Sequence, residues 1–104
     1  WFSAAKSAQI SIMKSLSKKN EFVRNGITFN TISPGPIFIK NTGWDDFKKK
    51  NKREYYRWIK ANIPQNRIGT PDDVSNIVTF ICSNYASFVN GQNIKIDGGQ
   101  SNSA

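Results

Sequence analysis

Residues 26–33, which read Gly-Ile-Thr-Phe-Asn-Thr-Ile-Ser, constrain the fold of this chain more than any other stretch. Their β-branched and aromatic side chains predict a strand, but polar and apolar residues do not alternate cleanly along it. A strand without alternation is typical of a sheet that is covered on both faces, as parallel sheets are. Pro34, Gly35 and Pro36 then predict an abrupt end to the strand. The pattern places the chain in the α/β class.

A second strand is predicted near the C-terminal end, over 92–97. Turn residues precede it at 90–91 and end it at 98–99, and a helix is predicted between the two strands over 71–84. Strands joined through a helix are parallel neighbours, and a sheet of only two strands is marginal by itself. We therefore expect the C-terminal part of a doubly wound parallel sheet, with the first half of that sheet missing from this sequence.

The N-terminal residues 3–19 are predicted to form a helix with two faces. One face is apolar, and the other carries small residues that would let another backbone approach closely. The apolar face holds Ala5, Ala8, Ile12, Met13 and Leu16, and the small-residue face holds Ser3, Ser7 and Ser11. We expect the apolar face to need a partner.

The helix predicted over 71–84 has the clearest start signals in the sequence. Thr70 is a natural N-cap, Pro71 suits the first helical position, and Asp73 stands where the acid of a capping box belongs. The spacing of five following residues predicts a core-facing stripe of Val74, Ile77, Val78, Ile81 and Cys82. Arg67 is expected to anchor the loop before this helix.

Composition excludes several kinds of chemistry. The sequence has no His, which removes His-based triads and imidazole zinc ligands, so no metal site is predicted. The single Cys82 cannot form an internal disulfide, which fits a reducing cytoplasm. The sequence shows no signal-peptide pattern and no apolar run near the ~20 residues of a membrane span. We therefore predict a cytoplasmic protein without a membrane segment.

A run of basic residues over 48–53 contributes to a net charge of +8. Next to aromatic residues such a run can bind nucleic acid, because cations neutralise phosphates and rings stack on bases. The alternative is a solvated helix face with its aromatic residues turned inward, and the near-helical spacing favours it. The inward stripe would hold Trp44, Phe47, Tyr55, Trp58 and Ile59. Nucleic-acid binding is the weaker alternative.

Four stretches in this order resemble the C-terminal half of short-chain dehydrogenases/reductases, which are Rossmann-fold, nicotinamide-dependent oxidoreductases. They read FSAAKSA from residue 2, NTISPGPI, RIGTPDDVSNIVTFICS and ASFVNGQNIKIDGG. The resemblance implies one partial Rossmann-type domain over 1–104, in which 38–64 is the variable helical segment that binds substrate. It implies NAD or NADP as cofactor and a small carbonyl or alcohol as substrate. The family's glycine-rich nucleotide turn and catalytic Ser do not occur in these residues.

The resemblance also implies roles for two residues of the first helix. Lys6 matches the family Lys that lowers the pKa of the catalytic phenol and holds the ribose hydroxyls of the nicotinamide nucleotide. Phe2 stands at the position of the catalytic Tyr, one helical turn earlier, and has no hydroxyl with which to transfer a proton. We predict a cofactor role for Lys6 and, for Phe2, a packed ring without proton chemistry.

The loop at Pro34, Gly35 and Ile37 matches the family loop whose backbone grips the nicotinamide carboxamide. Glycine allows a close approach and proline fixes the turn, although a plain strand-ending turn remains an alternative. Ile39 stands where the family often has a Thr, which puts one polar cofactor contact in doubt. Asn30 and Ser33, like the glycines near the C-terminal end, are expected to serve the fold.

Three functions follow as hypotheses. The first is the C-terminal part of an NAD(P)-dependent oxidoreductase, inactive alone. The second is a non-catalytic binding or assembly fragment of the same fold, and the third is a basic nucleic-acid-binding module. The spare helix face predicts self-association into a homo-oligomer.

Overall fold

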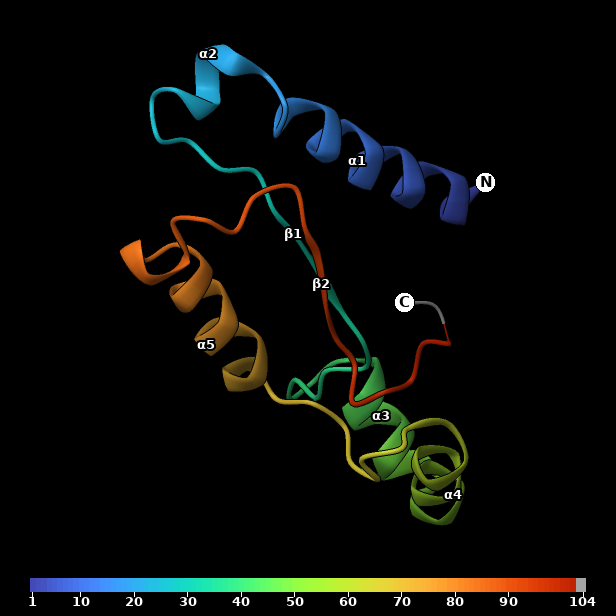
Figure 1. Ribbon diagram of the computed structural model, residues 1–104. Helices are drawn as coiled ribbons and strands as arrows, with labels where there is room; N and C mark the ends of the chain where they lie inside the picture. The colour runs from blue at the N-terminus through green and yellow to red at the C-terminus, as the bar shows by residue number, and fades with distance from the viewer. Residues whose placement is uncertain (103–104) are drawn as a thin grey trace. The chain divides into compact units, whose positions relative to one another are not determined.

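The computed structural model describes residues 1–102, which form five α-helices, a short 3₁₀ helix and two strands in an α/β arrangement (Figure 1). In chain order these elements are α1 (Phe2–Leu16), α2 (Asn20–Val23), β1 (Thr31–Pro34), α3 (Gly43–Lys50), α4 (Lys52–Asn62), α5 (Pro71–Ile81), the 3₁₀ helix Asn84–Ala86 and β2 (Asn93–Ile96). None of the helices in this part of the chain combines the length and the apolar character that a membrane crossing requires.

The two strands pair with each other. The N–H of Thr31 donates to the carbonyl of Gln92 at 2.8 Å, and the N–H of Gly35 donates to the carbonyl of Ile96 at 2.9 Å. Because the partner's number rises along both strands, the pair is parallel. This confirms the predicted parallel arrangement, and β2 falls within the strand expected over 92–97.

The first strand is shorter than the sequence predicted. β1 begins at Thr31 rather than residue 26 and ends at Pro34. Ahead of it, the N–H of Phe29 donates to the side-chain oxygen of Asn90 at 2.9 Å, so a side chain takes the place of a ladder partner. The side chain of Asn30 also replaces ladder partners. Its side-chain amide donates to the carbonyl of Val89, and its side-chain oxygen accepts from the N–H of Gln92. Asn30 therefore serves the fold, as expected.

The described chain divides into two compact units. The first contains Trp1–Ile32 and Ile77–Ile94, and the second contains Ser33–Asn76 and the segment that begins at Lys95. The prediction of a single domain over 1–104, with a substrate segment at 38–64, stays a prediction.

In the first unit, buried contacts gather around the turn at 90–91. The amide of Asn90 donates to the carbonyl of Ser17 at 2.8 Å, and the buried hydroxyl of Ser17 donates to the carbonyl of Lys14 at 2.7 Å. Gly91 has a φ of +71°, and a side chain there would collide with Ser17. This turn fixes the end of α1.

The predicted apolar faces of α1 and α5 are only partly covered. Ile12 on α1 is 58% exposed, and Val78 and Cys82 at the end of the α5 stripe are also exposed. The core-facing stripe predicted over 74–82 is confirmed only in part: Val74, Ile77 and Ile81 are half-buried, but α5 has no fully buried residue. A stripe at helical spacing shows that a helix can pack, but the packing itself needs a partner layer.

The helices predicted over 3–19 and 71–84 both end earlier than expected. Helix α1 ends at Leu16 and is followed by α2, and α5 ends at Ile81 and is followed by a 3₁₀ turn. At the end of α5 the N–H of Ser83 reaches back three residues to the carbonyl of Phe80, which tightens the last turn.

The second unit contains a hydrophobic core. Helices α3 and α4 pack against each other, and the core is formed by Tyr55, Ile59, Ile63 and Ile68, with Phe38, Trp44, Phe47 and Trp58 packed against it. The prediction of inward-facing aromatic residues is therefore confirmed. Asn51 separates the two helices and caps α4, because its side-chain oxygen accepts from the N–H of Glu54 at 3.1 Å.

Candidate functional site

The loop that follows β1 is held from two sides. The N–H of Gly35 bonds to the end of β2, as described above, and a short parallel bridge joins the next part of the loop to Gly69. In this bridge, the N–H of Gly69 donates to the carbonyl of Pro36 at 3.0 Å, and the N–H of Phe38 donates to the carbonyl of Gly69 at 2.8 Å. The segment 35–38 is thus fixed without being part of a long strand.

This bridge leaves the backbone of Ile37 free on its other side. In a parallel bridge the residues before and after the bridged residue make the bonds, so the N–H and C=O of the bridged residue point the opposite way. Within residues 1–102, no hydrogen bond engages the N–H or the C=O of Ile37. A donor and an acceptor that have no protein partner therefore lie next to each other on a fixed loop.

Glycine is required at position 35 for a steric reason. A Cβ at Gly35 would lie 2.7 Å from the Cβ of Asp97 and 2.8 Å from its Cα. Asp97 is itself fixed, since its carboxylate accepts from the N–H of Gly99 at 3.0 Å and from the N–H of Ser101 at 3.1 Å. Hydrogen bonds from the hydroxyl and backbone of Ser101 and the backbone of Gly99 lower the pKa of Asp97. The sequence did not predict this contact.

Phe2 and Lys6 lie together on the first turns of α1. The ammonium of Lys6 is 5.7 Å from the centre of the Phe2 ring, and both residues are exposed. Their four-residue spacing puts them on one face of the helix, as predicted. Within the described residues, no carboxylate pairs with Lys6. These two residues belong to the first unit, and the loop 34–37 belongs to the second.

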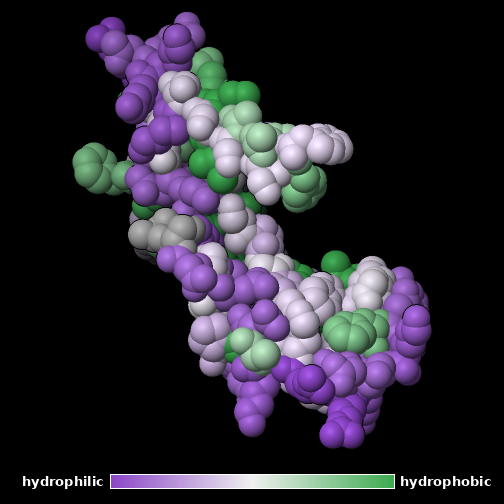
Figure 2. Space-filling model, turned by 90° about the vertical axis from the view of Figure 1, so that its right-hand side faces the viewer, coloured by the Kyte–Doolittle hydropathy of each residue, from purple (hydrophilic) through white to green (hydrophobic). Residues whose placement is uncertain are grey.

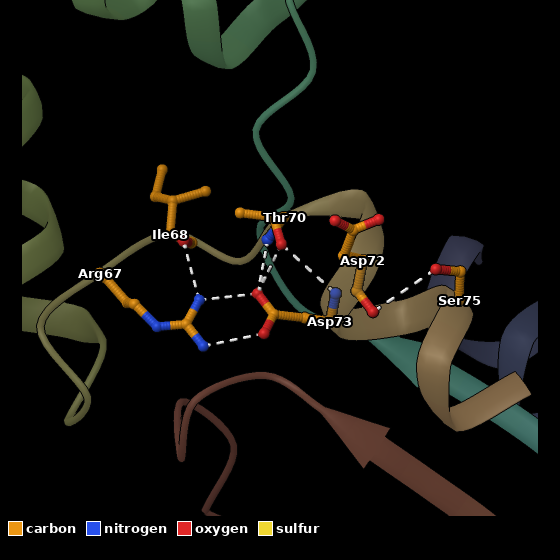
Figure 3. Close-up of polar contacts among 6 residues, drawn as sticks. All are labelled: Arg67, Ile68, Thr70, Asp72, Asp73 and Ser75. Atoms are coloured by element: carbon orange, nitrogen blue, oxygen red, sulfur yellow. Dashed lines mark hydrogen bonds and ion pairs between the residues drawn. The ribbon is translucent and has the colours of Figure 1, made fainter. Parts of the chain in front are cut away.

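The start of α5 is organised by Arg67, Thr70 and Asp73 (Figure 3). Arg67 donates to the two carboxylate oxygens of Asp73 at 2.7 and 2.9 Å. The same carboxylate accepts from the N–H of Thr70 at 2.7 Å, and the N–H of Asp73 donates back to the Thr70 hydroxyl at 3.3 Å. The predicted cap and the predicted anchoring by Arg67 are both confirmed.

The charges of this group shift each other. The Arg67 guanidinium, followed by the N–H of Thr70, holds the pKa of Asp73 well below its usual range. Conversely, the hydrogen bond and the charge of Asp73 raise the pKa of Arg67. The group therefore fixes the loop between the second-unit core and α5, and it has no free proton to offer near neutral pH.

Lys48, which the sequence indicated only as part of a basic run, lies among three aromatic rings. Its ammonium is 5.4 Å from the ring centre of Phe38, 5.7 Å from that of Tyr55 and 5.8 Å from that of Tyr56. Burial raises the pKa of Tyr55, while the Lys48 charge opposes that effect. Lys48 contacts Phe38, which directly follows Ile37 in the sequence. This adjacency is the only feature of the sequence from which a contact between the basic run and the loop could have been inferred.

A pocket of about 400 Å³ lies in the first unit. It is lined by residues around 26–30 and 81–87, and the exposed thiol of Cys82 is among them. None of the predicted site residues lines it. Residues 1–102 hold no group of three or more side chains that could bind a metal ion.

Comparison with known proteins places these features in a family. A family model described as enoyl-(acyl carrier protein) reductase matches residues 1–101. The probable 2,4-dienoyl-CoA reductase 3 of Caenorhabditis elegans is 40% identical over 99 residues, which are 94% of this chain and 31% of the relative. The chain spans only about a third of the length of the curated relatives it matches.

Solved structures show the same relation. A short chain dehydrogenase from Bacillus anthracis has a TM-score of 0.72 and 32% identity, and the match covers 93% of this chain and 35% of that one. 4-Hydroxyisoleucine dehydrogenase complexed with NADH has a TM-score of 0.80 and 30% identity, with 97% and 39% covered. The predicted fold class, part of a Rossmann-type α/β sheet, is confirmed. The chain belongs to the short-chain dehydrogenase/reductase family.

Proposed function

We propose that this chain is the C-terminal part of an oxidoreductase that transfers a hydride between NAD or NADP and a small carbonyl or alcohol substrate. The observation that carries the proposal is the fixed backbone of Ile37, whose N–H and C=O have no protein partner within residues 1–102. A carboxamide offers a carbonyl acceptor and an amide donor, so it can satisfy both groups at once. Pro34 and Gly35 hold the loop in the shape that presents them.

Lys6 fits the ribose side of such a cofactor. Its ammonium has three donors and no carboxylate partner in the described residues, so it can donate to the ribose hydroxyls. The cofactor supplies or accepts the hydride, and the protein supplies position and the proton. Phe2 stands where the family has its proton donor and cannot fill that role, so we expect turnover to be slow while residue 2 is Phe.

We further propose that the 104 residues alone do not turn over substrate. They contain neither the glycine-rich turn that binds the cofactor phosphates nor the family Ser in a matching context. A phenol at position 2 is also missing. We assign the protein to the cytoplasm, where the exposed Cys82 thiol would stay reduced.

The test is to join this chain to the first half of a family enzyme, which carries the glycine-rich turn and the Ser. We expect the joined protein to bind NADH or NADPH, measured by nicotinamide fluorescence. Lys6→Ala should weaken binding by roughly tenfold, since it removes hydrogen bonds to two hydroxyls. Lys18→Ala is the matched control, because Lys18 is exposed on the same unit and should leave affinity unchanged.

Two results would count against the proposal. If the joined protein folds but binds neither cofactor, the proposed oxidoreductase function is refuted, because the loop and Lys6 would then have no ligand. Equal affinity in the Lys6→Ala and Lys18→Ala variants would refute the role of Lys6 and leave the loop 34–37 as the only proposed cofactor contact within this chain.

A second candidate function is a non-catalytic assembly fragment of the same fold. The exposure of large apolar residues in the first unit favours it: Trp1 is 99% exposed, Phe2 68% and Ile12 58%. A contiguous patch of such residues would be a contact surface for another chain. Association without any cofactor affinity in the joined protein would support this candidate over the first.

A further inference from the structure

The ammonium of Lys48 is held by aromatic rings instead of by a carboxylate. Phe38, Tyr55 and Tyr56 come from the loop after β1 and from α4, and their ring centres lie 5.4–5.8 Å from the Lys48 nitrogen. Rings attract a cation through their negative faces, but they do not neutralise its charge. A half-buried cation in this setting remains able to take an anion.

Two cations of the same helices differ from Lys48, because each of them pairs with a carboxylate. Lys49 pairs with the buried Asp45 at 2.9 Å, and Arg57 pairs with Glu54 at 3.1 Å. Within residues 1–102, no carboxylate pairs with Lys48. Acids therefore lie beside Lys49 and Arg57, whereas aromatic rings lie beside Lys48.

The surrounding segment adds to the attraction for an anion. Residues 40–60 contain eight lysines and arginines and three acidic residues. Figure 2 shows strongly hydrophilic side chains projecting from the unit that contains α3 and α4. A surface of one charge sign raises the local concentration of small ions of the opposite sign.

Lys48 is also close to the loop that the proposed function assigns to the cofactor. The Phe38 ring beneath its ammonium belongs to the residue after Ile37, and the N–H of Phe38 fixes the loop through Gly69. A substrate must lie beside the nicotinamide to exchange a hydride with it. The ammonium of Lys48 therefore contacts the side chain of the residue that directly follows the loop proposed to hold the nicotinamide.

We propose that Lys48 is a specificity-determining residue that binds a carboxylate or phosphate group of the substrate, and that Phe38, Tyr55 and Tyr56 hold its ammonium in place until that group arrives. The proposal rests on the proposed function for the position of the nicotinamide. It narrows the substrate class to carbonyl or alcohol compounds that carry an anionic group. An ammonium on a flexible stem can leave the rings and reach such a group without a change in the backbone.

The experiment uses the 104-residue chain without cofactor, so its outcome does not depend on cofactor binding. Propionate and inorganic phosphate are the anionic probes, and propionamide is the neutral probe of the same size as propionate. All titrations are made at constant ionic strength. The readout is the NMR signal of the Lys48 ε-methylene group, which the three rings shift upfield, together with probe affinity from the same titration.

We expect both anions to move the Lys48 signal toward that of an exposed lysine, and propionamide to leave it in place. A stronger response to phosphate than to propionate would identify a phosphate-bearing substrate, and the reverse would identify a carboxylate. Lys48→Met should weaken anion binding by roughly tenfold, as expected for the loss of a charge-assisted hydrogen bond. Lys50→Met, which removes the same charge two residues away on α3, should change it by less than about twofold because its charge is exposed and screened.

Lys48→Arg guards against a purely structural effect, because arginine keeps the charge and the ring contacts. It should retain anion binding while Lys48→Met loses it. Equal weakening in the Lys48→Met and Lys50→Met variants would overturn the proposal, since diffuse charge would then explain the binding. A Lys48 signal that neither anion moves would overturn it too, as would binding of a single-stranded oligonucleotide without any response to the small anions.

Discussion

At the scale of single residues, the proposed function predicts that Phe2 limits the turnover rate of the joined enzyme. A phenylalanine cannot donate a proton to a carbonyl oxygen, and general acid catalysis of this kind contributes roughly 10²–10⁴-fold to a rate. We therefore predict that Phe2→Tyr in the joined protein raises turnover by about that factor. Cofactor affinity should change little, because the ring keeps its size and the proposed ribose contacts come from Lys6. Steady-state turnover and cofactor titration of both forms measure this.

Equal and substantial turnover with Phe or Tyr at position 2 would contradict that prediction. It would mean that another group donates the proton. Phe2→Leu serves as the control for the ring itself, since it removes the contact with the Lys6 ammonium without adding a hydroxyl.

Asp73 gives a second prediction at the residue scale, which concerns pH. Its folded-state pKa is held below the value of about 3.9 for an unfolded Asp, so its stabilising effect is complete above that value and is lost as the pH falls further. Asp73→Asn should therefore lower the melting temperature at pH 6–7, and the gap to the parent protein should narrow below about pH 4. Thermal unfolding at several pH values measures the gap.

Asp72→Asn is the control for this measurement, because it removes the same charge in the same helical turn without an ion pair to Arg67. A gap for Asp73→Asn that stays constant from pH 7 to pH 2 would show that the carboxylate charge does not stabilise the fold.

At the scale of elements, local chemistry in the sequence predicted helix starts better than helix ends. The start of α5 was predictable because the Thr70 hydroxyl and the Asp73 carboxylate satisfy backbone groups within four residues of each other. The end of α5 and the start of β1 depend on partners far along the chain, such as Asn90 for Phe29. Propensity carries no information about those partners.

The candidate site, too, was predictable where it depends on local sequence and not where it depends on contacts between distant residues. The family motif proposed Lys6 and the loop 34–37 as candidates, but the steric need for Gly35 came from Asp97, about sixty residues away. Likewise, the basic run contained Lys48, yet only the packing of α3 on α4 distinguished it from its neighbours. Sequence patterns indicate which residues are available, and contacts between elements decide which of them are set apart.

Substitutions of two isoleucines test which helix contributes more packing energy to the stability of the fold. Ile59 on α4 is 3% exposed within the second-unit core, and Ile12 on α1 is 58% exposed. We predict that Ile59→Ala lowers the free energy of unfolding by about 2–5 kcal/mol, because it removes buried methyl groups and leaves a cavity. Ile12→Ala should change it by less than about 0.5 kcal/mol in the dissociated chain.

Urea unfolding followed by tryptophan fluorescence suits this comparison, since Trp44 and Trp58 lie in the same core as Ile59. Similar losses for the two variants would mean that α1 is covered in solution by a surface that the isolated chain does not provide.

At the scale of the whole molecule, four separated motifs were sufficient to predict the family, because each is tied to a different part of one sheet fold. The match over residues 1–101 supports that inference. What the motifs could not predict is how a chain with a two-stranded sheet protects its apolar helix faces. A sheet of that size is marginal, so the answer must involve surfaces beyond those two strands.

This leads to the prediction that the chain self-associates. In the first unit, Ile12, Val23 and Ile27 are each at least 45% exposed, and the small residues Ser3 and Ser7 would let a second helix approach α1 closely. Burying such a surface between copies removes apolar area from water, which favours association at roughly 25 cal/mol per Å² before the entropy of ordering is subtracted.

Light scattering at micromolar concentration should therefore give a mass above that of one chain. Ile12→Lys should shift the chain toward the monomer, because it places a charge in the contact. Ile39→Lys, at a residue 50% exposed in the second unit, should leave the mass unchanged. A compact, stable monomer for the parent chain would show that these faces tolerate water, and the assembly candidate would then lose its support.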